Sequence, residues 1–340
     1  MKFFFPLLAS AALVITMVCG SPMMRQEESG TDVSSCSTVT IKSLTVPAGV
    51  TLDLSDLKSG ASVVFSGTTT FGEKIWSGPL VLLTGTDLTV SGTGTLDGQG
   101  AWYWKQGTSI TRPVFFRMSK VISSTVKGFK IKNSPYRTFS IINSQPTTVS
   151  GLTLDSSAGD DTAKNTDGFD LSKNTDVTIS GNTIYNQDDC LAMQSSTNTV
   201  FSSNTCSGGH GISIGSIGGS SVSSSDTVSG LTVKNNKIIN SVNGIRIKTI
   251  IDDYGTVEDV TYTSNTLSNV ENAIVIHGDY SKSKGGYTGT ASSKVTIKDI
   301  TSTVYDILVN SKYASGWTFS GIDVSGSTGS CSGEPSGVSC

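Results

Sequence analysis

The stretch Asp189-Cys-Leu-Ala-Met193 recurs along the chain in a form that decides its fold. Each copy reads polar, small, apolar, variable, apolar, and the others are Asp167-Gly-Phe-Asp-Leu171, His210-Gly-Ile-Ser-Ile214, Asn243-Gly-Ile-Arg-Ile247 and Asn272-Ala-Ile-Val-Ile276. A repeat spaced at roughly 20–35 residues is typical of a solenoid, whose stacked units bury one continuous core. Equivalent positions of successive units then lie about 4.8 Å apart. We therefore expect Asp167, Asp189 and His210 to be neighbours in space.

A second series of short segments alternates with the first, once in each unit. Each segment has the period of a β-strand and ends in Asn, Asp or Gly, which tolerate left-handed turn geometry. The clearest copies are 177–182, 200–204, 231–236, 260–265 and 295–299. No helical period lies between the two series. The chain is therefore predicted to be all-β, folded as a parallel β-helix.

The first series also predicts which side chains point into the core. Two inward ladders are expected, Phe169/Leu191/Ile212/Ile245/Ile274 and Leu171/Met193/Ile214/Ile247/Ile276. The outward position between them holds Asp170, Ala192, Ser213, Arg246 and Val275. Strict alternation would send Asp167 inward as well, and a buried unpaired carboxylate is costly. We therefore expect a bend or bulge at the opening of that strand.

The ends and composition of the chain indicate an exported protein. Lys2 precedes an apolar run at 3–19 that is followed by small residues, so 1–20 is predicted to be a signal peptide. Residues 21–35 are expected to be a pro-segment or a loose N-terminus, and 36–340 a single β-helix domain. No later apolar stretch is long enough for a membrane span. The 24 basic and 27 acidic residues argue against nucleic acid as a partner.

Cysteine usage agrees with secretion into an oxidising compartment, where disulfides form. Cys190 and Cys206 lie on successive predicted coils, and Cys331 and Cys340 could close a C-terminal loop. Once the signal peptide is removed, Cys36 has no evident partner and is treated as a candidate free thiol.

Three carboxylates, those of Asp167, Asp188 and Asp189, converge if the coils stack as predicted. Crowding like charges raises the pKa of at least one of them. One protonated and one or two ionised carboxylates are what cleavage of a glycosidic bond needs, because the acid protonates the leaving oxygen while the others activate water. His210, on the next coil, could hydrogen-bond a carboxylate or the substrate. No spacing typical of a zinc site supports a catalytic metal, and none is predicted.

Arg246 and Lys248 flank Ile247 and point to the same face, one coil after His210. They could neutralise the carboxylates or bind an anionic substrate, and Arg is suited to bidentate carboxylate contact. An acidic polysaccharide would explain both signs of charge in one groove. The alternative is a purely structural solenoid, such as an adhesin, whose Asp and Asn residues only form turns.

The four charged blocks resemble those of a known enzyme family. The blocks Asn165-Thr-Asp-Gly-Phe-Asp170, Gln187-Asp-Asp-Cys190, Gly209-His-Gly-Ile-Ser-Ile-Gly215 and Arg246-Ile-Lys248 are similar to the signatures of fungal-type polygalacturonases, which are glycoside hydrolases of family 28. The resemblance runs from about Cys36 to Cys340. It implies a single-stranded right-handed β-helix of about ten coils, and a secreted endo-acting enzyme that hydrolyses the α-1,4 bonds of polygalacturonate (pectin) with inversion.

The resemblance also implies roles for individual residues. Asp188 would be the general acid, Asp167 and Asp189 would activate water, and His210 would assist. The expected substrate contacts are Arg246, Lys248, Tyr280 and Asn165. The family's disulfides match Cys190–Cys206 and Cys331–Cys340, whereas its N-terminal bridge has no counterpart at Cys36.

The expected partners are pectin and plant polygalacturonase-inhibiting proteins, and the protein is expected to be a monomer without a cofactor. Two alternatives from other classes stay open at this point. One is a pectate lyase, which eliminates rather than hydrolyses and commonly needs calcium. The other is a homologue that binds pectin without cleaving it.

Overall fold

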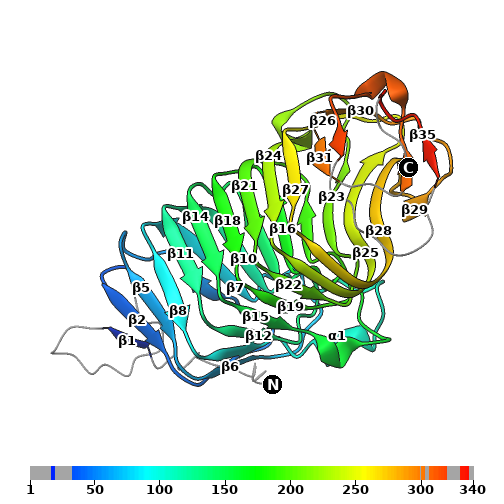
Figure 1. Ribbon diagram of the computed structural model, residues 1–340. Helices are drawn as coiled ribbons and strands as arrows, with labels where there is room; N and C mark the ends of the chain where they lie inside the picture. The colour runs from blue at the N-terminus through cyan, green and yellow to red at the C-terminus, as the bar shows by residue number, and fades with distance from the viewer. Residues whose placement is uncertain (1–16, 20–32, 299, 303–305, 320–329, 337–340) are drawn as a thin grey trace, which may run out of the picture.

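The chain folds as a stack of coils, each contributing a strand to three parallel ladders (Figure 1). The computed structural model describes residues 17–19, 33–298, 300–302, 306–319 and 330–336. The coils follow the sequence along the stack, from the N-terminal strands to the C-terminal ones (Figure 1). The predicted all-β parallel solenoid is therefore confirmed.

The first ladder begins with β2 and passes from coil to coil in a continuous parallel sheet. Short β1 (Met17–Cys19) pairs with its outer edge in the antiparallel direction. The strands of this ladder are β2 (Thr38–Ile41), β5 (Ser62–Phe65), β8 (Thr89–Gly92), β11 (Ser124–Lys127), β14 (Thr147–Ser150), β17 (Asn174–Thr175), β18 (Val177–Ser180), β21 (Ser196–Ser202), β24 (Thr227–Lys234), β26 (Tyr254–Glu258), β27 (Val260–Thr263), β30 (Lys294–Lys298), β31 (Ile300–Ser302), β33 (Ala314–Ser315) and β34 (Thr318–Phe319).

The second and third ladders are joined at the C-terminal end, because two long strands run through both. These strands are β25 (Lys237–Ile250) and β28 (Thr266–Ser281). Before them, the second ladder holds β3 (Leu44–Val46), β6 (Thr68–Phe71), β9 (Thr95–Asp97), β12 (Lys130–Lys132), β15 (Thr153–Asp155), β19 (Thr183–Tyr185) and β22 (Thr205–Ser207).

The third ladder carries the charged repeat. It holds β4 (Leu52–Leu54), β7 (Val81–Thr86), β10 (Phe116–Ile122), β13 (Phe139–Ile142), β16 (Phe169–Ser172), β20 (Leu191–Met193) and β23 (Ile212–Ile217), then β25, β28, β32 (Asp306–Leu308) and β35 (Cys331–Ser332). The short strand β29 (Gly286–Tyr287) folds back on β28 as an antiparallel hairpin.

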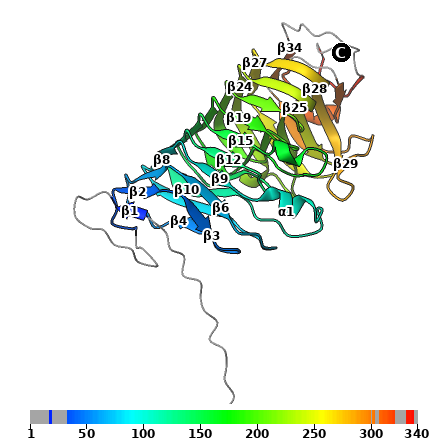
Figure 2. The ribbon, with the colours of Figure 1, turned by 90° about the horizontal axis from the view of Figure 1, so that it is seen from below.

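Helical segments are short and lie outside the ladders. They are α1 (Gly100–Trp104), η1 (Ser157–Gly159), η2 (Ser224–Asp226) and η3 (Ser311–Tyr313). Figure 2 shows that α1 and the β28–β29 hairpin project from the same side of the stack. None of the described helices is long and apolar enough to cross a membrane.

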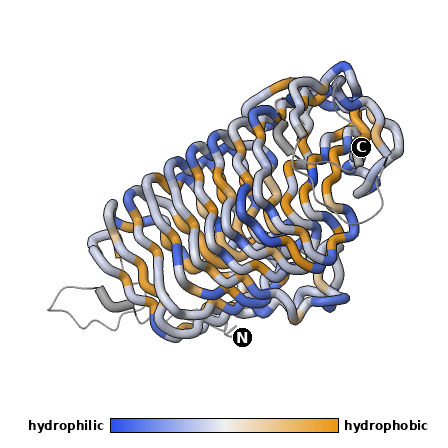
Figure 3. The backbone as a smooth tube through the Cα atoms, in the orientation of Figure 1, coloured by the Kyte–Doolittle hydropathy of each residue, from blue (hydrophilic) through white to orange (hydrophobic). Residues whose placement is uncertain are grey.

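The core is a set of apolar rows that run along the stack, visible in Figure 3 as apolar segments repeated from coil to coil. Phe139 and Phe169 stack with ring centroids 5.2 Å apart, and Phe116 lies 5.0 Å from Phe139. Full burial of such a side chain contributes about 1.5–3 kcal/mol. Each coil therefore supports its two neighbours, which fixes the spacing of everything attached to it.

Both predicted inward ladders are confirmed by the strand register. Phe169 pairs with Leu191, Leu191 with Ile212, Ile212 with Ile245 and Ile245 with Ile274, and all are buried. The outward row from Asp170 to Val275 is in register too, although neighbouring side chains and loops cover most of its surface.

The alignment of the last segment in the second series was wrong. Residues 295–299 were laid over 260–265, but Val260 pairs with Ile300, and Ile297 pairs with Val257 of the preceding strand. A left-handed residue, Asp259, divides this stretch into β26 and β27. Because both halves alternate with period 2, the sequence pattern alone fits either register.

The left-handed turns expected at the ends of these segments are present, but they do not fall on the terminal Asn residues. The left-handed residues are Gly181, Ser203, Asn235 and Ser264, each one position earlier. The Asn side chains that follow form a hydrogen-bonded ladder from coil to coil. Asn204 Oδ1 accepts from the backbone N–H of Asn182 at 2.9 Å, while Asn204 Nδ2 donates to Ile179 O at 3.1 Å. Asn is needed here because its amide is donor and acceptor at once.

The cysteines agree with the prediction in part. Cys190 and Cys206 form a disulfide with Cα atoms 5.9 Å apart. Cys331 is disulfide-bonded, while Cys340 lies outside the described residues. Cys36 is disulfide-bonded as well, so its treatment as a candidate free thiol was wrong. Most of the predicted signal peptide and of 21–35 lies outside the described residues, and these assignments stay predictions.

Replacing Asn204 by Ala should lower the free energy of unfolding by about 2–3 kcal/mol, because it leaves the buried Asn182 backbone N–H and amide without their acceptor. Urea unfolding followed by circular dichroism measures the change. Asn272→Ala is the matched control, since its amide is exposed, and it should change stability by about 0.5 kcal/mol or less. Equal losses in both variants would contradict a stabilising ladder.

Candidate active site

An open groove of about 720 Å³ runs across the third ladder. All the residues that the sequence nominated for catalysis or substrate binding line it: Asn165, Asp167, Asp188, Asp189, His210, Arg246, Lys248 and Tyr280. The stacking of coils therefore brings together residues separated by more than 100 positions in the sequence.

In the three titratable copies of the repeat the polar position lies just outside the strands, as the prediction of a bend required, whereas Asn243 and Asn272 lie within β25 and β28. Asp167, Asp189 and His210 each come two residues before the first residue of β16, β20 and β23. Backbone bonds lock these turns together, from Gly168 N to Asp189 O at 2.9 Å and from Cys190 N to Gly211 O at 2.7 Å. The polar side chains can therefore line the groove while the strands that follow fill the core.

Glycine is required on both sides of His210 because the coils approach closely there. Gly209 and Gly211 have φ of 65° and 74°. A Cβ on Gly209 would lie 2.1 Å from Asp188 O, and one on Gly211 would lie 2.1 Å from Asn243 O. The two glycines thus allow His210 to sit directly beside Asp188.

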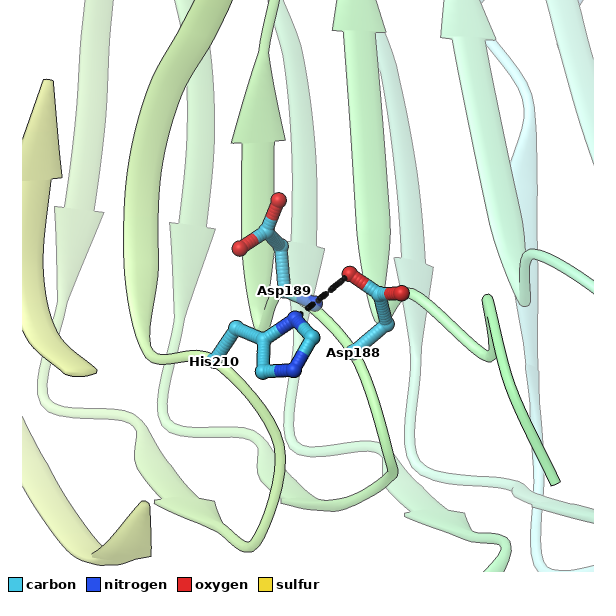
Figure 4. A group of neighbouring side chains, drawn as sticks. All are labelled: Asp188, Asp189 and His210. Carbon is cyan, nitrogen blue, oxygen red and sulfur yellow. Dashed lines mark hydrogen bonds and ion pairs between the residues drawn. The ribbon is translucent and has the colours of Figure 1, made fainter. Parts of the chain in front are cut away.

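Asp188 and His210 form a hydrogen-bonded pair (Figure 4). His210 Nδ1 lies 3.1 Å from Asp188 Oδ1, and the Asp189 backbone N–H donates to the same oxygen at 2.8 Å. Burial raises the pKa of Asp188, but the hydrogen bond and charge of His210 outweigh it, and the pKa falls to about 2. In the open groove Asp188 is therefore a carboxylate held by His210.

Asp189 is held by two cations, Arg246 and Lys248, which the family resemblance assigns to substrate binding. Its Oδ1 accepts from Arg246 Nη2 and, at 2.6 Å, from Ser213 Oγ. Lys248 Nζ donates to Oδ2 at 2.9 Å. The Asp189 side chain is only 3% exposed, so these contacts compensate a buried charge.

Asp167 has the opposite electrostatic situation. Burial and the nearby charges of Asp170, Asp188 and Asp189 raise its pKa well above the usual range. Burial also raises the pKa of Asp170, against the lowering effect of Arg137, to about 7. The crowded carboxylates therefore hold protons on the Asp167–Asp170 side of the groove at mildly acidic pH.

Asn165 contacts Asp188, and its assignment as a substrate ligand stays a prediction. Its Nδ2 donates to Asp188 Oδ2 at 3.2 Å, and its Oδ1 accepts from Arg112 Nη2 at 2.9 Å. Arg112 also donates to the carbonyl oxygen of Lys164 at 2.6 Å. Arg112 thus orients Asn165, a link that nothing in the sequence pattern indicates.

Tyr280 closes the C-terminal end of the groove. Lys248 Nζ lies 5.7 Å from the centre of its ring, and Tyr287 of the β28–β29 hairpin packs edge-on against it at 5.8 Å. Tyr287 also lines the groove and was not nominated from the sequence. Tyr280 therefore lies in the same groove as the acidic cluster.

Arg137 was also not nominated from the sequence. Its Nε lies 2.7 Å from Asp170 Oδ2, although neither atom makes a well-aligned hydrogen bond, so the contact is ionic. The signal was present, because Arg137-Thr-Phe-Ser-Ile141 is a further copy of the opening repeat. It begins with a cation followed by Thr, and for that reason it did not stand out from the acidic copies.

Asp188, Asp189 and His210 are close enough to offer three ligand atoms to one metal ion, all within 4.8 Å of one another. The contacts of these atoms do not fit such a site. Asp189 already binds Arg246 and Lys248, and the ring nitrogen of His210 faces Asp188. A divalent cation would have to displace two fixed positive charges.

The comparisons with known proteins agree with this geometry. The model of the family described as glycosyl hydrolases family 28 matches residues 36–340. Endopolygalacturonase B of Aspergillus niger is 43% identical over 352 aligned residues, which cover 98% of this chain and 95% of that protein.

Two solved structures have the same architecture. Endopolygalacturonase I from Stereum purpureum, solved with two galacturonate molecules, is 32% identical with a TM-score of 0.68, covering 89% of this chain and 91% of that one. Endo-xylogalacturonan hydrolase from Aspergillus tubingensis is 26% identical with a TM-score of 0.76, covering 91% and 92%.

Asp167→Asn should stabilise the protein at neutral pH. A carboxyl whose pKa is raised on folding binds its proton more tightly in the folded state, so stability falls as pH rises from about 4 through the folded pKa. Asn does not ionise and so avoids this loss of stability, which is about 1.4 kcal/mol for each unit by which folding raises the pKa of Asp167. The gain in melting temperature over wild type should be larger at pH 7 than at pH 4.

Asp176→Asn serves as the control, because Asp176 is exposed and its left-handed backbone suits Asn. Scanning calorimetry at both pH values should give it no pH-dependent gain. A gain for Asp167→Asn that is the same at pH 4 and pH 7 would count against a raised pKa in the folded protein.

Proposed function

The chain belongs to glycosyl hydrolases family 28, whose model matches residues 36–340, and we propose that it cleaves the α-1,4-galacturonosyl bonds within polygalacturonate chains. The observation that carries the proposal is the groove itself, in which a cluster of buried carboxylates is flanked by cations. Carboxylates supply acid and base for hydrolysis, and the cations recognise an acidic polymer. The identity to endopolygalacturonase B of Aspergillus niger supports the same substrate and the endo mode.

Family membership decides between the reaction classes that the sequence left open. A hydrolase adds water across the glycosidic bond, whereas a lyase eliminates. The groove holds the groups for hydrolysis, with the carboxylate of Asp188 bonded to His210 and a protonation-prone carboxyl at Asp167. The chain is therefore treated as a glycoside hydrolase rather than a pectate lyase or a structural solenoid.

In the proposed mechanism Asp188 is the general acid. A carboxyl group and an imidazole joined by a hydrogen bond can share one proton between them. Asp188 passes this proton to the glycosidic oxygen as the bond to the anomeric carbon breaks. After the transfer, His210 takes up a proton from solvent, which restores the shared proton of the pair.

Water attacks the anomeric carbon from the opposite face of the sugar, so the configuration inverts. Asp167 and Asp189 orient this water, and one of them takes up its proton. The net change adds one water across the bond. Asp189 is the better supported base, because Asp167 has a raised pKa and tends to hold a proton of its own.

The pKa order in the open groove favours a different allocation, with Asp167 as acid and Asp188 as base. Asp167 has the raised pKa, and that of Asp188 is lowered to about 2. The two allocations predict that different variants stay active on a substrate with a good leaving group. Only the general acid becomes dispensable when the departing oxygen needs no proton.

Asp188→Asn should therefore lower kcat on polygalacturonate by several orders of magnitude with binding retained. On an oligogalacturonide with a nitrophenyl leaving group it should keep a large part of the wild-type rate, whereas Asp167→Asn should lose both activities. Stopped assays of both variants on both substrates measure this. If Asp167→Asn alone recovers on the activated substrate, the reverse allocation is correct.

The endo mode has a direct test. Early in the reaction, the viscosity of a polygalacturonate solution should fall much faster than reducing ends appear, because internal cuts shorten long chains. Monogalacturonate as the sole early product would contradict it, and products absorbing in the ultraviolet would indicate elimination. Xylogalacturonan is a useful second substrate, given the structural likeness to the Aspergillus tubingensis enzyme.

The proposal extends to the setting in which the enzyme works. Secretion is supported by the apolar N-terminal run and by the Cys190–Cys206 disulfide, which needs an oxidising compartment. A monomer that acts on pectin, and that plant inhibitor proteins can bind, is proposed from the family resemblance alone.

A further inference from the structure

We propose that Arg137 binds a carboxylate of the substrate polymer at the end of the acidic cluster opposite to Arg246 and Lys248. The inference rests on the proposed function, because a galacturonan presents one carboxylate on every sugar. It adds a recognition residue at the N-terminal end of the groove, where the sequence blocks nominate no cation.

The coil register places Arg137 in the same ladder as the catalytic carboxylates. Phe139 pairs with Phe169, so Arg137, two residues before Phe139, corresponds to Asp167 on the next coil. The bond from Thr138 N to Asp167 O, at 2.7 Å, joins the two turns directly. Arg137 is therefore the polar position of the coil that precedes the acidic cluster.

The guanidinium of Arg137 is held in place on one edge. Its Nε is ion-paired with Asp170 Oδ2 at 2.7 Å. Its Cζ lies 5.1 Å from the ring centre of Tyr136, which also carries Arg112 at 4.9 Å. An arginine fixed in this way loses little conformational freedom when a ligand arrives.

The other edge of the guanidinium is open. Within the described part of the chain, neither Nη1 nor Nη2 has a hydrogen-bond partner, and the side chain is 35% exposed on the groove. Two parallel N–H groups of this kind match the two oxygens of a carboxylate. Arg246, in contrast, uses Nη2 and Nε on Asp189 and Ser213.

Lys164 also lines the groove, but no contact among the described residues fixes its ammonium. The backbones of Arg137 and Lys248 lie four coils apart in the ladder, roughly 19 Å at about 4.8 Å per coil. Their charged groups lie closer together, because Arg137 reaches Asp170 one coil on and Lys248 reaches Asp189 two coils back. A polymer held by both cations therefore lies along the groove that the acidic cluster lines.

The test compares Arg137→Gln with wild type on polygalacturonate and on highly methyl-esterified pectin. The KM for polygalacturonate should rise about tenfold or more, because a charge-assisted pair of hydrogen bonds is lost, while kcat changes less than about threefold. The KM for esterified pectin should change much less. Arg137→Lys keeps the charge but lacks the paired N–H groups, so its KM for polygalacturonate should lie between those of wild type and Arg137→Gln.

Removing Arg137 also leaves Asp170 without its counter-ion, which could disturb Asp167. Asp170→Asn and the double variant Arg137→Gln/Asp170→Asn separate this effect, since neither contains an unpaired Asp170. The double variant should still show the rise in KM relative to Asp170→Asn. Lys127→Gln on β11, an exposed lysine in the first ladder, controls for net charge.

An unchanged KM in the double variant relative to Asp170→Asn would overturn the proposal, as would an equal rise on both substrates. A loss confined to kcat, with a shifted pH profile, would show that Arg137 acts only through Asp170, and would overturn it too. These outcomes leave the proposed function intact if wild type depolymerises polygalacturonate. Wild type that releases no reducing ends from polygalacturonate would refute the function and the inference together.

Discussion

The register of hydrogen bonds between coils is the constraint on which the rest of the molecule depends. The parallel pairing of Phe169, Leu191 and Ile212 fixes the position of every residue on either side of them. A slip of one residue would exchange the buried and groove-facing rows. The apolar rows and the Asn ladder both oppose such a slip, so the scaffold and the alignment of Asp167, Asp189 and His210 have the same physical origin.

Stacking acidic residues at this spacing creates repulsion that must be balanced within the groove. Asp188 is balanced by His210, Asp189 by Arg246 and Lys248, and Asp170 by Arg137. Among the described residues Asp167 has no ion pair of its own to offset the burial and the neighbouring negative charges that raise its pKa. A group left poorly compensated where others are paired is typical of a functional site, since a purely structural stack gains nothing from it.

The sequence predicted the solenoid, the two inward ladders and the members of the acidic cluster, because these follow from periodicity and coil spacing. It did not predict the partners. Whether Lys248 faces Asp189 or open groove depends on side-chain rotamers, which period 2 does not encode. Asn165, predicted to bind substrate, also donates a hydrogen bond to Asp188, which periodicity does not encode. The Arg137 copy was not recognised because its first residue is a cation. The misplaced segment 295–299 had an apolar alternation that fits two registers equally well.

The low pKa of Asp188 and its proposed role as acid are reconciled by what a substrate does to the groove. A galacturonate carboxylate that binds Lys248 and Arg246 adds negative charge beside the cluster, and the bound sugars exclude water. Both changes raise the pKa of a carboxyl. His210, hydrogen-bonded to Asp188 Oδ1, is the nearest group able to exchange a proton with it. The pKa of about 2 therefore applies to Asp188 in the open groove. In the proposed mechanism Asp188 becomes protonated when substrate occupies the groove.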